Sequence, residues 1–388
     1  MAHGISQVRA YDQPLWPIHA PVVTPDPSVR SRWESGGVQV EGLLYRATTD
    51  NVFTEDLSLP LLRWTVVWNA DKGAGEKLSL KLQLDSRILL TAYRDWVAPV
   101  LRLTWADGVV EEQQFGLFML DMEDATIYAD FAIAEYDGFD PTRRLQNSVV
   151  LDTYNVAAAT NAATAITNAI TPVWPRVVVP QTARTIASAI SWFPFSGRYD
   201  IAAKIAEASG WYYPYPDLVG QIHSRPYVDL ATESPVMELD EADFQGTLRV
   251  VPTVTQLANI VVVTKPGLAD ADPIQSIQIN DDPTDPISTV NREPLVKRIT
   301  NNDIQTQGEA DAIAREEVRS ARSFYQVVSG ELPPGVWMRP YQVVSLNAEH
   351  TAWGNLSGRY HLRVFEVGSQ PSDNVKVEMN RWVEVTSG

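Results

Sequence analysis

The sequence predicts a mainly β protein in which two antiparallel β-sandwich or barrel domains flank a smaller α+β domain. Runs of alternating apolar and polar residues occur towards both ends of the chain, and short helical patterns lie mostly between them. The length of 388 residues suggests two or three domains of roughly 100 to 200 residues. We expect an extended arm over 1–37, a first β domain over 38–138, a middle α+β domain over 139–245 and a second β domain over 246–388.

The composition argues against several classes of protein. With 31 basic and 48 acidic residues the formal charge is -17, which disfavours a protein that grips duplex DNA or lies on anionic lipid, because both need clustered Lys and Arg. There is no cysteine, so disulfides and thiolate metal sites are excluded. The first residues lack the pattern of a signal peptide, and the uncharged stretch 153–175 is too polar to cross a membrane.

The first β domain follows a proline-rich arm. Its clearest strand is "KLSLKLQL", in which Leu78, Leu80, Leu82 and Leu84 alternate with Lys77, Ser79, Lys81 and Gln83. The turn Asn69–Glu76 joins this strand to "LLRWTVVW" as a hairpin, and Asp107–Gly108 predicts a second hairpin turn. Tryptophans within these runs are expected in the core or at subunit interfaces: Trp64, Trp68, Trp96 and Trp105.

The stretch "AEYDGFDPTRRLQ" has two readings, a catalytic acidic turn or a hinge between domains. Asp140 suits a helix cap, Pro141 suits the first helical position, and Leu145 is placed to pack back on the sheet. We therefore interpret it as the exit from the first β domain into a helix.

The middle domain is predicted to contain two helices. The first covers Val156–Ile170, within an Ala- and Thr-rich segment whose apolar face is weak. The second carries Ile201, Ala202, Ile205 and Ala208 on one stripe and ends at Gly210. An aromatic strand and a turn at Asp217–Gly220 complete the domain.

The second β domain is predicted to be another sandwich with one helix. Strands are expected at "TQLANIVVVT", "PIQSIQIN" and four later runs, and Thr306 with Glu309 has the spacing of a capping box. The helix places its small apolar residues on one stripe, which we expect to lie against the domain's sheet: Ala310, Ile313, Ala314, Val318 and Ala321. Arg315 and Arg319 on the opposite side are candidates for ion pairs between subunits.

No catalytic, cofactor-binding or metal-binding residue is predicted. The five histidines show no metal-ligand spacing, and the glycine-rich "DKGAGEK" lacks the order of a phosphate-binding loop and lies between strands. Three acidic clusters are read as turn formers rather than as the paired acids of a glycosidase: Asp121, Glu123 and Asp124; Asp137 and Asp140; Asp281, Asp282 and Asp285. A calcium site near Asp270, Asp272 and Asp282 is an alternative, although the EF-hand pattern is missing.

The order of several short motifs resembles the tail hub proteins of tailed bacteriophages. The junction "IAEYDGFDPTRRL" looks like theirs, and "YDIAAKIAEASGWYYPYPDLVGQI" is similar to the helix and strand of their middle domain. The run from "EPLVKRIT" to "RPYQVVSL" resembles their closing domain. The resemblance covers 38–388; the arm and the Ala/Thr-rich segment at 153–171 fall outside it.

The resemblance implies a structural, non-enzymatic protein of the virion tail tip. It implies a homotrimeric ring whose first and last domains are tail-tube-like and share one topology, which joins a sixfold tube to a threefold tip with DNA leaving through the bore. The partners it implies are a distal tail protein, a tape-measure protein and tip or fibre proteins, and no cofactor or membrane anchor. Since the chain ends at Gly388, soon after its last strand, we expect no fused spike or lysozyme domain.

Two alternatives stay open at this point. The tryptophans and carboxylates also suit a secreted carbohydrate-active β-sandwich enzyme, and a monomeric carbohydrate-binding module on a phage or cell surface is the other. Mass in solution separates them from a hub, because a hub self-associates.

Overall fold

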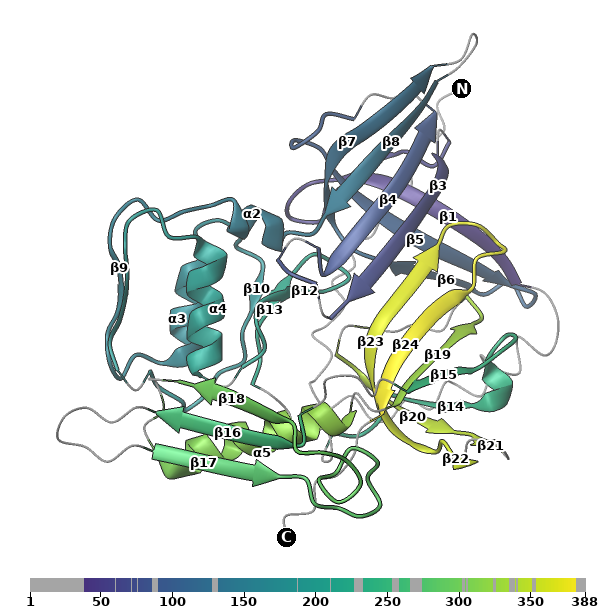
Figure 1. Ribbon diagram of the computed structural model, residues 1–388. Coiled ribbons are helices and arrows are strands. Elements are labelled where there is room, and N and C mark those ends of the chain that lie inside the picture. Colours follow the sequence, from purple (N-terminus) through teal and green to yellow (C-terminus); the bar gives the residue numbers. More distant parts are fainter. Residues whose placement is uncertain are drawn as a thin grey trace, which may run out of the picture.

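A computed structural model describes most of the chain from Val38 to Arg381. Residues outside the description are 1–37, 60, 71, 75, 86–89, 128–131, 187, 210, 227–232, 253–257, 266–273, 302–303, 305, 324–325, 335–338, 340, 351–353 and 382–388. The predicted arm at 1–37, the helix end at Gly210 and two residues of the calcium alternative, Asp270 and Asp272, therefore lie outside the described residues. The described part is mainly antiparallel β, as the sequence predicted (Figure 1).

The first β unit is an antiparallel sheet that curls on itself. Its strands are β1 (Val38–Ala47), β2 (Phe53–Asp56), β3 (Leu61–Asn69), β4 (Leu78–Asp85), β5 (Trp96–Trp105), β6 (Val110–Gln114), β7 (Phe118–Ile127) and β8 (Ala132–Phe139). Both predicted hairpins are confirmed, since β3 pairs with β4 and β5 with β6. The four leucines of β4 are buried on the inner face of the sheet, as expected, and so are Trp64, Trp68 and Trp105. Trp96 is buried on the opposite face, in the core of the middle unit.

The middle unit packs two helices against short strands. Its elements are α2 (Thr142–Gln146), β9 (Tyr154–Val156), α3 (Ala162–Ile170), β10 (Val177–Val178), β11 (Ile190–Trp192), α4 (Arg198–Ala208), β12 (Tyr215–Pro216) and β13 (Ile222–His223). The predicted start of the first helix at Val156 is wrong: α3 begins at Ala162, because the Asn161 side chain caps it by accepting the Thr164 N–H. Nor is its apolar face weak, since Ile166 and Ile170 are fully buried in the core shared with α4.

The second β unit consists of β14 (Met237–Asp240), a 3₁₀ turn η1 (Glu241–Asp243), β15 (Arg249–Pro252), β19 (Gln326–Leu332), β20 (Val343–Asn347), β21 (Glu349–His350), β22 (Gly354–Asn355), β23 (Gly358–Gly368) and β24 (Val375–Arg381). Between β15 and β19 the chain leaves this sheet. It builds a separate lobe from β16 (Ile260–Lys265), β17 (Ile274–Ile279), β18 (Val296–Thr300) and α5 (Gln307–Ser323).

This lobe corrects the expectation of one sandwich with one helix. The three lobe strands form their own sheet, so they do not extend the sandwich (Figure 1). The predicted apolar stripe of α5 is confirmed, because Ala310, Ala314 and Val318 are buried in the lobe core against Val261 and Val263 of β16. Small side chains at this face let the helix approach the sheet closely.

The two β units share one strand order. The first reads β3-β4-β8-β7-β5-β1 across the sheet, and the second reads β15-β19-β24-β23-β20-β14. When the six strands of each unit are numbered along the chain, leaving out β2, β6, β21 and β22, both orders are 2-3-6-5-4-1. A bulge also falls at the matching place, between Met122 and Asp124 of β7 and between Leu362 and Val364 of β23. One difference is that β14 runs parallel to β20, whereas β1 runs antiparallel to β5.

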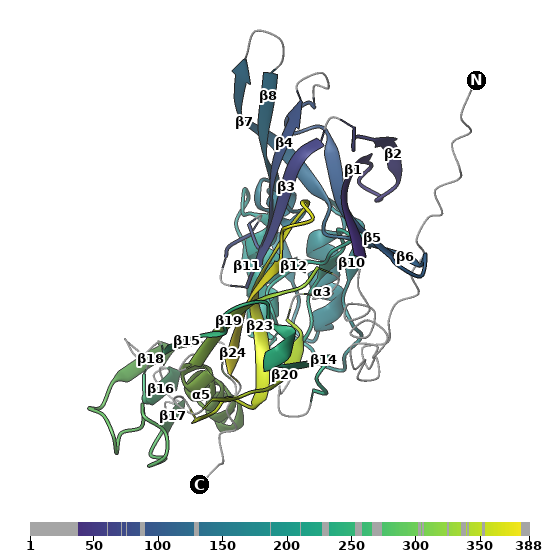
Figure 2. The ribbon, with the colours of Figure 1, turned by 90° about the vertical axis from the view of Figure 1, so that its right-hand side faces the viewer.

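The two units form one continuous sheet. β3 of the first unit pairs with β23 of the second, so a 14-stranded sheet runs through both (Figures 1 and 2). One large apolar core follows it across the joint and includes Trp64, Trp68, Phe365 and Met379. Among the described helices, none is long and apolar enough to cross a bilayer.

Candidate assembly interface

The two β units are joined edge to edge, where β3 of the first unit pairs with β23 of the second. The register of this joint pairs Thr65 with Gly368 and Asn69 with Val364. Just past the end of β23, Ser369 makes two hydrogen bonds with Trp64 of β3: the Trp64 N–H donates to Ser369 Oγ at 2.9 Å, and the Ser369 N–H donates to the Trp64 carbonyl at 3.0 Å. Arg63 pairs with Asp373 across the same joint at 3.5 Å.

Gly42 of β1 lets a third strand close over this joint. A methyl group at Gly42 would lie 2.4 Å from Ser369 Cβ and 2.6 Å from the Ser369 carbonyl oxygen. The indole N–H of Trp64 donates to the Leu43 carbonyl of the same strand at 3.1 Å. Because glycine has no side chain, β1 of the first unit packs directly against Ser369 of the second unit.

Tyr341 connects all three parts of the molecule. Its ring packs on Trp68 of the first unit at 5.3 Å and on Tyr215 of the middle unit at 4.8 Å between centroids. Arg225 of the middle unit donates to the Tyr341 carbonyl at 3.1 Å, and Lys77 donates to its hydroxyl at 3.2 Å. The Tyr341 backbone is left-handed, with φ of 56°, a conformation held here by these contacts.

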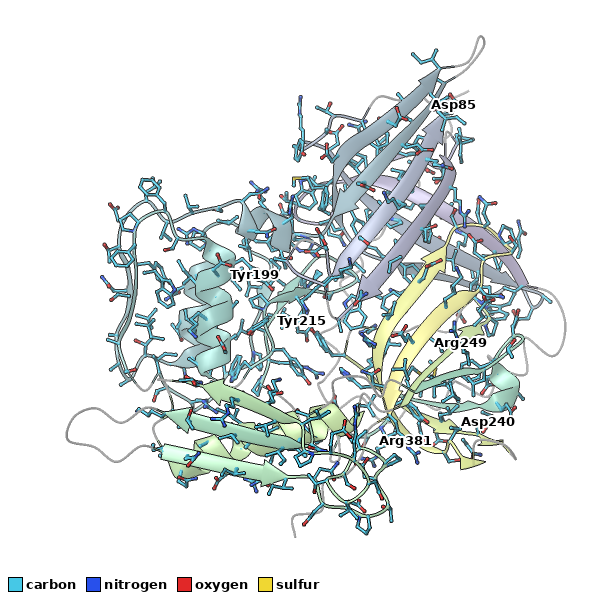
Figure 3. All side chains as sticks on the ribbon, in the orientation of Figure 1. Asp85, Tyr199, Tyr215, Asp240, Arg249 and Arg381 are labelled. Atoms are coloured by element: carbon cyan, nitrogen blue, oxygen red, sulfur yellow. The ribbon has the colours of Figure 1, made fainter. Side chains whose placement is uncertain are left out.

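Aromatic side chains make up much of this junction, beside the charged groups of Lys77 and Arg225. Burial raises the pKa of Tyr215 to about 12, so its hydroxyl stays neutral over the physiological range. Figure 3 shows Tyr215 between the middle unit and the two β units. We infer that the three parts are held as one framework, because rings packed at these distances add to the free energy of unfolding beyond their buried area.

The exit from the first unit is a helix start, as the sequence predicted. The Asp140 carboxylate accepts the Thr142 N–H at 2.7 Å and the Leu78 N–H at 3.2 Å. Pro141 already has helical angles, and α2 begins at Thr142. Leu145 is fully buried. Burial raises the pKa of Asp140 to about 6, against the hydrogen bonds and the nearby Lys77, which lower it.

Lys77 differs from its sequence assignment. Alternation put it on the polar face of the strand, but it precedes β4 and is buried, with its ammonium donating to the Ala70 carbonyl at 2.9 Å. The buried ammonium of Lys77 lies near the carboxylate of Asp140 and bonds to the hydroxyl of Tyr341, and these contacts compensate the cost of burying its charge. The alternation of the run at 77–84 misplaced Lys77, because Lys77 lies just before the first residue of β4, and Tyr341 was not singled out from the sequence.

The prediction that the acidic clusters form turns is confirmed for Asp140, Asp282 and Asp285, but it is wrong for Asp121, Asp124 and Asp137, which lie within the paired strands β7 and β8. Asp282 accepts the Thr284 N–H and Asp285 accepts the Ile287 N–H, both within one loop. Asp137 pairs with Lys81 at 2.6 Å, and Asp121 accepts the Tyr93 hydroxyl. The first two clusters lie side by side, because Asp121 of β7 pairs in register with Asp137 of β8. The third cluster lies apart from them, in the loop between β17 and β18 of the lobe.

A depression of about 500 Å³ lies beside β1 and β7. Tyr93, Arg94 and Arg144 are among its lining residues, and no carboxylate is. The paired acids of a glycosidase are therefore absent from this depression. Within the described residues, no group of three or more His, Asp or Glu side chains is placed to hold a metal ion.

An apolar patch lies exposed on the middle unit. Phe193 is 85% and Phe195 71% exposed, and Leu151 is next to them because the Phe195 N–H donates to the Val150 carbonyl. Phe195 has a left-handed backbone with φ of 70°. Such patches on soluble proteins mark contact sites for other proteins.

Solved structures similar to this chain include tail proteins. A tail protein from Neisseria meningitidis MC58 matches with a TM-score of 0.63 at 12% identity, covering 90% of this chain and 97% of that one. The 43 kDa tail protein of prophage MuSo2 from Shewanella oneidensis matches with a TM-score of 0.62 at 10% identity, over 88% and 98%.

A third match is a chain of the Francisella PdpA–VgrG complex, with a TM-score of 0.53 at 10% identity, over 94% of this chain and 62% of that chain. No family model and no curated protein sequence matches the chain. The structural likenesses show that the chain has the fold of phage tail proteins.

Proposed function

We propose that this chain is a structural tail protein and that three copies close into a ring, the tail hub. The observation that carries the proposal is the shared strand order of the two β units together with their edge-to-edge joint. Three such chains present six similar units around one axis. The likeness to solved tail proteins supports this role, because their fold is the fold of this chain.

The proposal also gives a role to the middle unit and the α5 lobe, which each chain carries only once. The six β units would face a sixfold tail tube or distal tail ring, whereas the middle unit and the α5 lobe, present three times, would face a threefold tip. A distal tail protein, a tape-measure protein and tip or fibre proteins are the partners we propose, at the virion tail tip. The exposed patch at Phe193 and Phe195 is a candidate contact for one of them.

The charge fits a conduit for DNA. Three chains at -17 each carry a formal charge of -51. A bore lined by basic groups would hold the phosphates and slow ejection, because each neutralised phosphate strengthens binding. We therefore propose a net negative bore through which DNA slides without specific binding.

Mass in solution tests the proposal. Light scattering on the purified chain should give three times 43.1 kDa, about 129 kDa, and class averages from electron microscopy should show a threefold ring with a central hole. A stable monomer at every concentration, or tight salt-dependent binding to double-stranded DNA, would contradict it. Turnover of a glycan panel by the monomer would instead support the carbohydrate-active enzyme, which the structural neighbours do not favour.

A further inference from the structure

Several strands of the large sheet have one edge without a strand partner within the described residues, among them β2, β6, β14 and β15. β5 pairs with β7 only at Phe118 and Met119, and Leu120 bonds to the backbone of Tyr93 and Asp95, so this edge of β7 is open beyond Asp121. β15 is the last strand of the sheet and pairs only with β19. Open edges are templates for pairing with another chain.

In the second unit, the edge of β23 that corresponds to this edge of β7 is paired along most of its length. The matching edge of β23 first pairs with β20, through Gly358 to His361, and then continues onto β3, through Val364 to Gly368. The bulges in β7 and β23 place Met122 level with Leu362 and Asp124 level with Val364. By this correspondence, the open edge of β7 is the part that in β23 holds the joint to β3.

The correspondence extends to the other side of the joint. Through their partners in β19 and β4, Val250 matches Trp64 and Arg249 matches Arg63. The open edge of β15 is thus the counterpart of the edge of β3 that binds β23. Each chain carries one half of the joint at β7 and the other half at β15.

We propose that β7 of one copy pairs antiparallel with β15 of a second copy, repeating between chains the joint that β23 and β3 form within one. The proposal rests on the ring described above and names its subunit contact. The register carried over from the pair Val367 and Val66 sets Ile127 opposite Pro252. Three such contacts between chains would alternate with three joints within chains.

The side chains at the β7 edge suit this contact. Ala125 and Ile127 occupy the places of Phe365 and Val367, which are buried, yet both are exposed and Ile127 is 82% exposed. Pairing with a second copy would cover them, and the burial of apolar surface favours association.

Two residues of β15, Arg249 and Pro252, disfavour pairing of its open edge with an arbitrary strand. Arg249 is exposed, and its counterpart Arg63 reaches across the inner joint to Asp373. Pro252 supplies no N–H, which blunts the edge against indiscriminate strand addition. Figure 3 shows Arg249 on the sheet of the second unit, and Figure 2 shows the β7–β8 hairpin standing out at the far end of the first unit.

The absence of cysteine makes a cross-linking test direct. The double variant Ile127→Cys with Pro252→Cys should form, on oxidation of the full-length chain, covalent trimers that run as monomers after reduction, because each chain carries both halves. Either single variant should not build a covalent trimer. As a matched control, Ile127→Cys with Val290→Cys pairs the same strand with a 61% exposed position outside the joint, and should not cross-link.

A second variant separates the contact from the fold. Ile127→Asp should weaken trimer formation at least tenfold in sedimentation while leaving the melting temperature of the monomer unchanged, and Val290→Asp should do neither. A trimer that forms without the cross-link and tolerates Ile127→Asp would overturn this joint and leave the ring standing. A chain that stays monomeric at its highest soluble concentration would overturn both.

Discussion

The buried carboxylate of Asp140 should make the stability of this protein fall as pH rises through 6. The residue is 0% exposed and sits where β4, β8 and α2 meet. Its hydrogen bonds from Thr142 and Leu78 favour the charged form, and so does Lys77, but desolvation outweighs them and raises the pKa to about 6. The group is thus protonated in the folded chain at pH values where it is ionised in the unfolded chain.

The magnitude follows from the two pKa values. The unperturbed pKa is 3.8 and the folded value about 6, a difference of about 2 units, and each unit corresponds to about 1.4 kcal/mol. Below pH 3.8 both states are protonated and the full stability is present. Between the two values the folded state binds more protons, so the free energy of unfolding falls with rising pH, by about 3 kcal/mol in all.

The variant Asp140→Asn isolates this effect, because it keeps an acceptor for Thr142 and cannot ionise. The free energy of unfolding should be measured in urea by tryptophan fluorescence, at pH values from 4 to 7.5. The wild-type chain should lose roughly 2 kcal/mol relative to Asp140→Asn over this range, because part of the total is already lost at pH 4. Asp137→Asn, on the same strand but paired with Lys81 at the surface, is the control and should show no comparable divergence.

Two results would refute the reasoning. If the wild type and Asp140→Asn keep a constant difference across the range, the carboxylate does not carry a desolvation penalty. If the wild type instead gains stability relative to Asp140→Asn as pH rises, the attraction of Lys77 outweighs desolvation and the pKa of Asp140 in the folded chain lies below 3.8.

Three further changes have outcomes set by single contacts. Gly42→Ala should destabilise the chain by about 1–3 kcal/mol through overpacking, since its methyl group would meet Ser369, whereas Gly73→Ala meets nothing within 4 Å and should be neutral in melting experiments. Ala314→Asp should unfold the α5 lobe, because it buries an unpaired charge, and hydrogen exchange should show lost protection in β16 and β17 with the large sheet still protected. Phe193→Ser should leave the melting temperature unchanged and weaken binding to a tail partner in pull-down or assembly assays; an unchanged assembly would remove the patch from the interface.

Period-two alternation was enough to predict the β3–β4 hairpin of the first unit, although the short strand β2 was not predicted. In β4 every second residue is apolar, and each of those leucines is buried. The α5 stripe was predictable from a different period, since Ala310, Ala314 and Val318 recur at helical spacing. Local chemistry also settled the exit at Asp140 and Pro141, because capping depends only on neighbouring residues.

Long-range choices could not be predicted in this way. Nothing local distinguishes the lobe strand β16 from the sandwich strand β19, and both are valine-rich. The start of α3 was missed because alanine and threonine at 156–161 are compatible with a helix, whereas the Asn161 cap fixes it later. Tyr341 gave no signal because its partners come from three parts of the chain.

The differences between the two β units lie where a ring of three would need them. Strand order, bulge position and the β3–β23 joint are common to both units or link them, as sixfold similarity requires. The lobe interrupts only the second unit, between β15 and β19, and the middle unit follows only the first, after β8. Both additions lie between strands rather than within a paired strand, so the strand order common to the two units is kept. The direction of one strand is not kept, because β14 runs parallel to β20 where β1 runs antiparallel to β5.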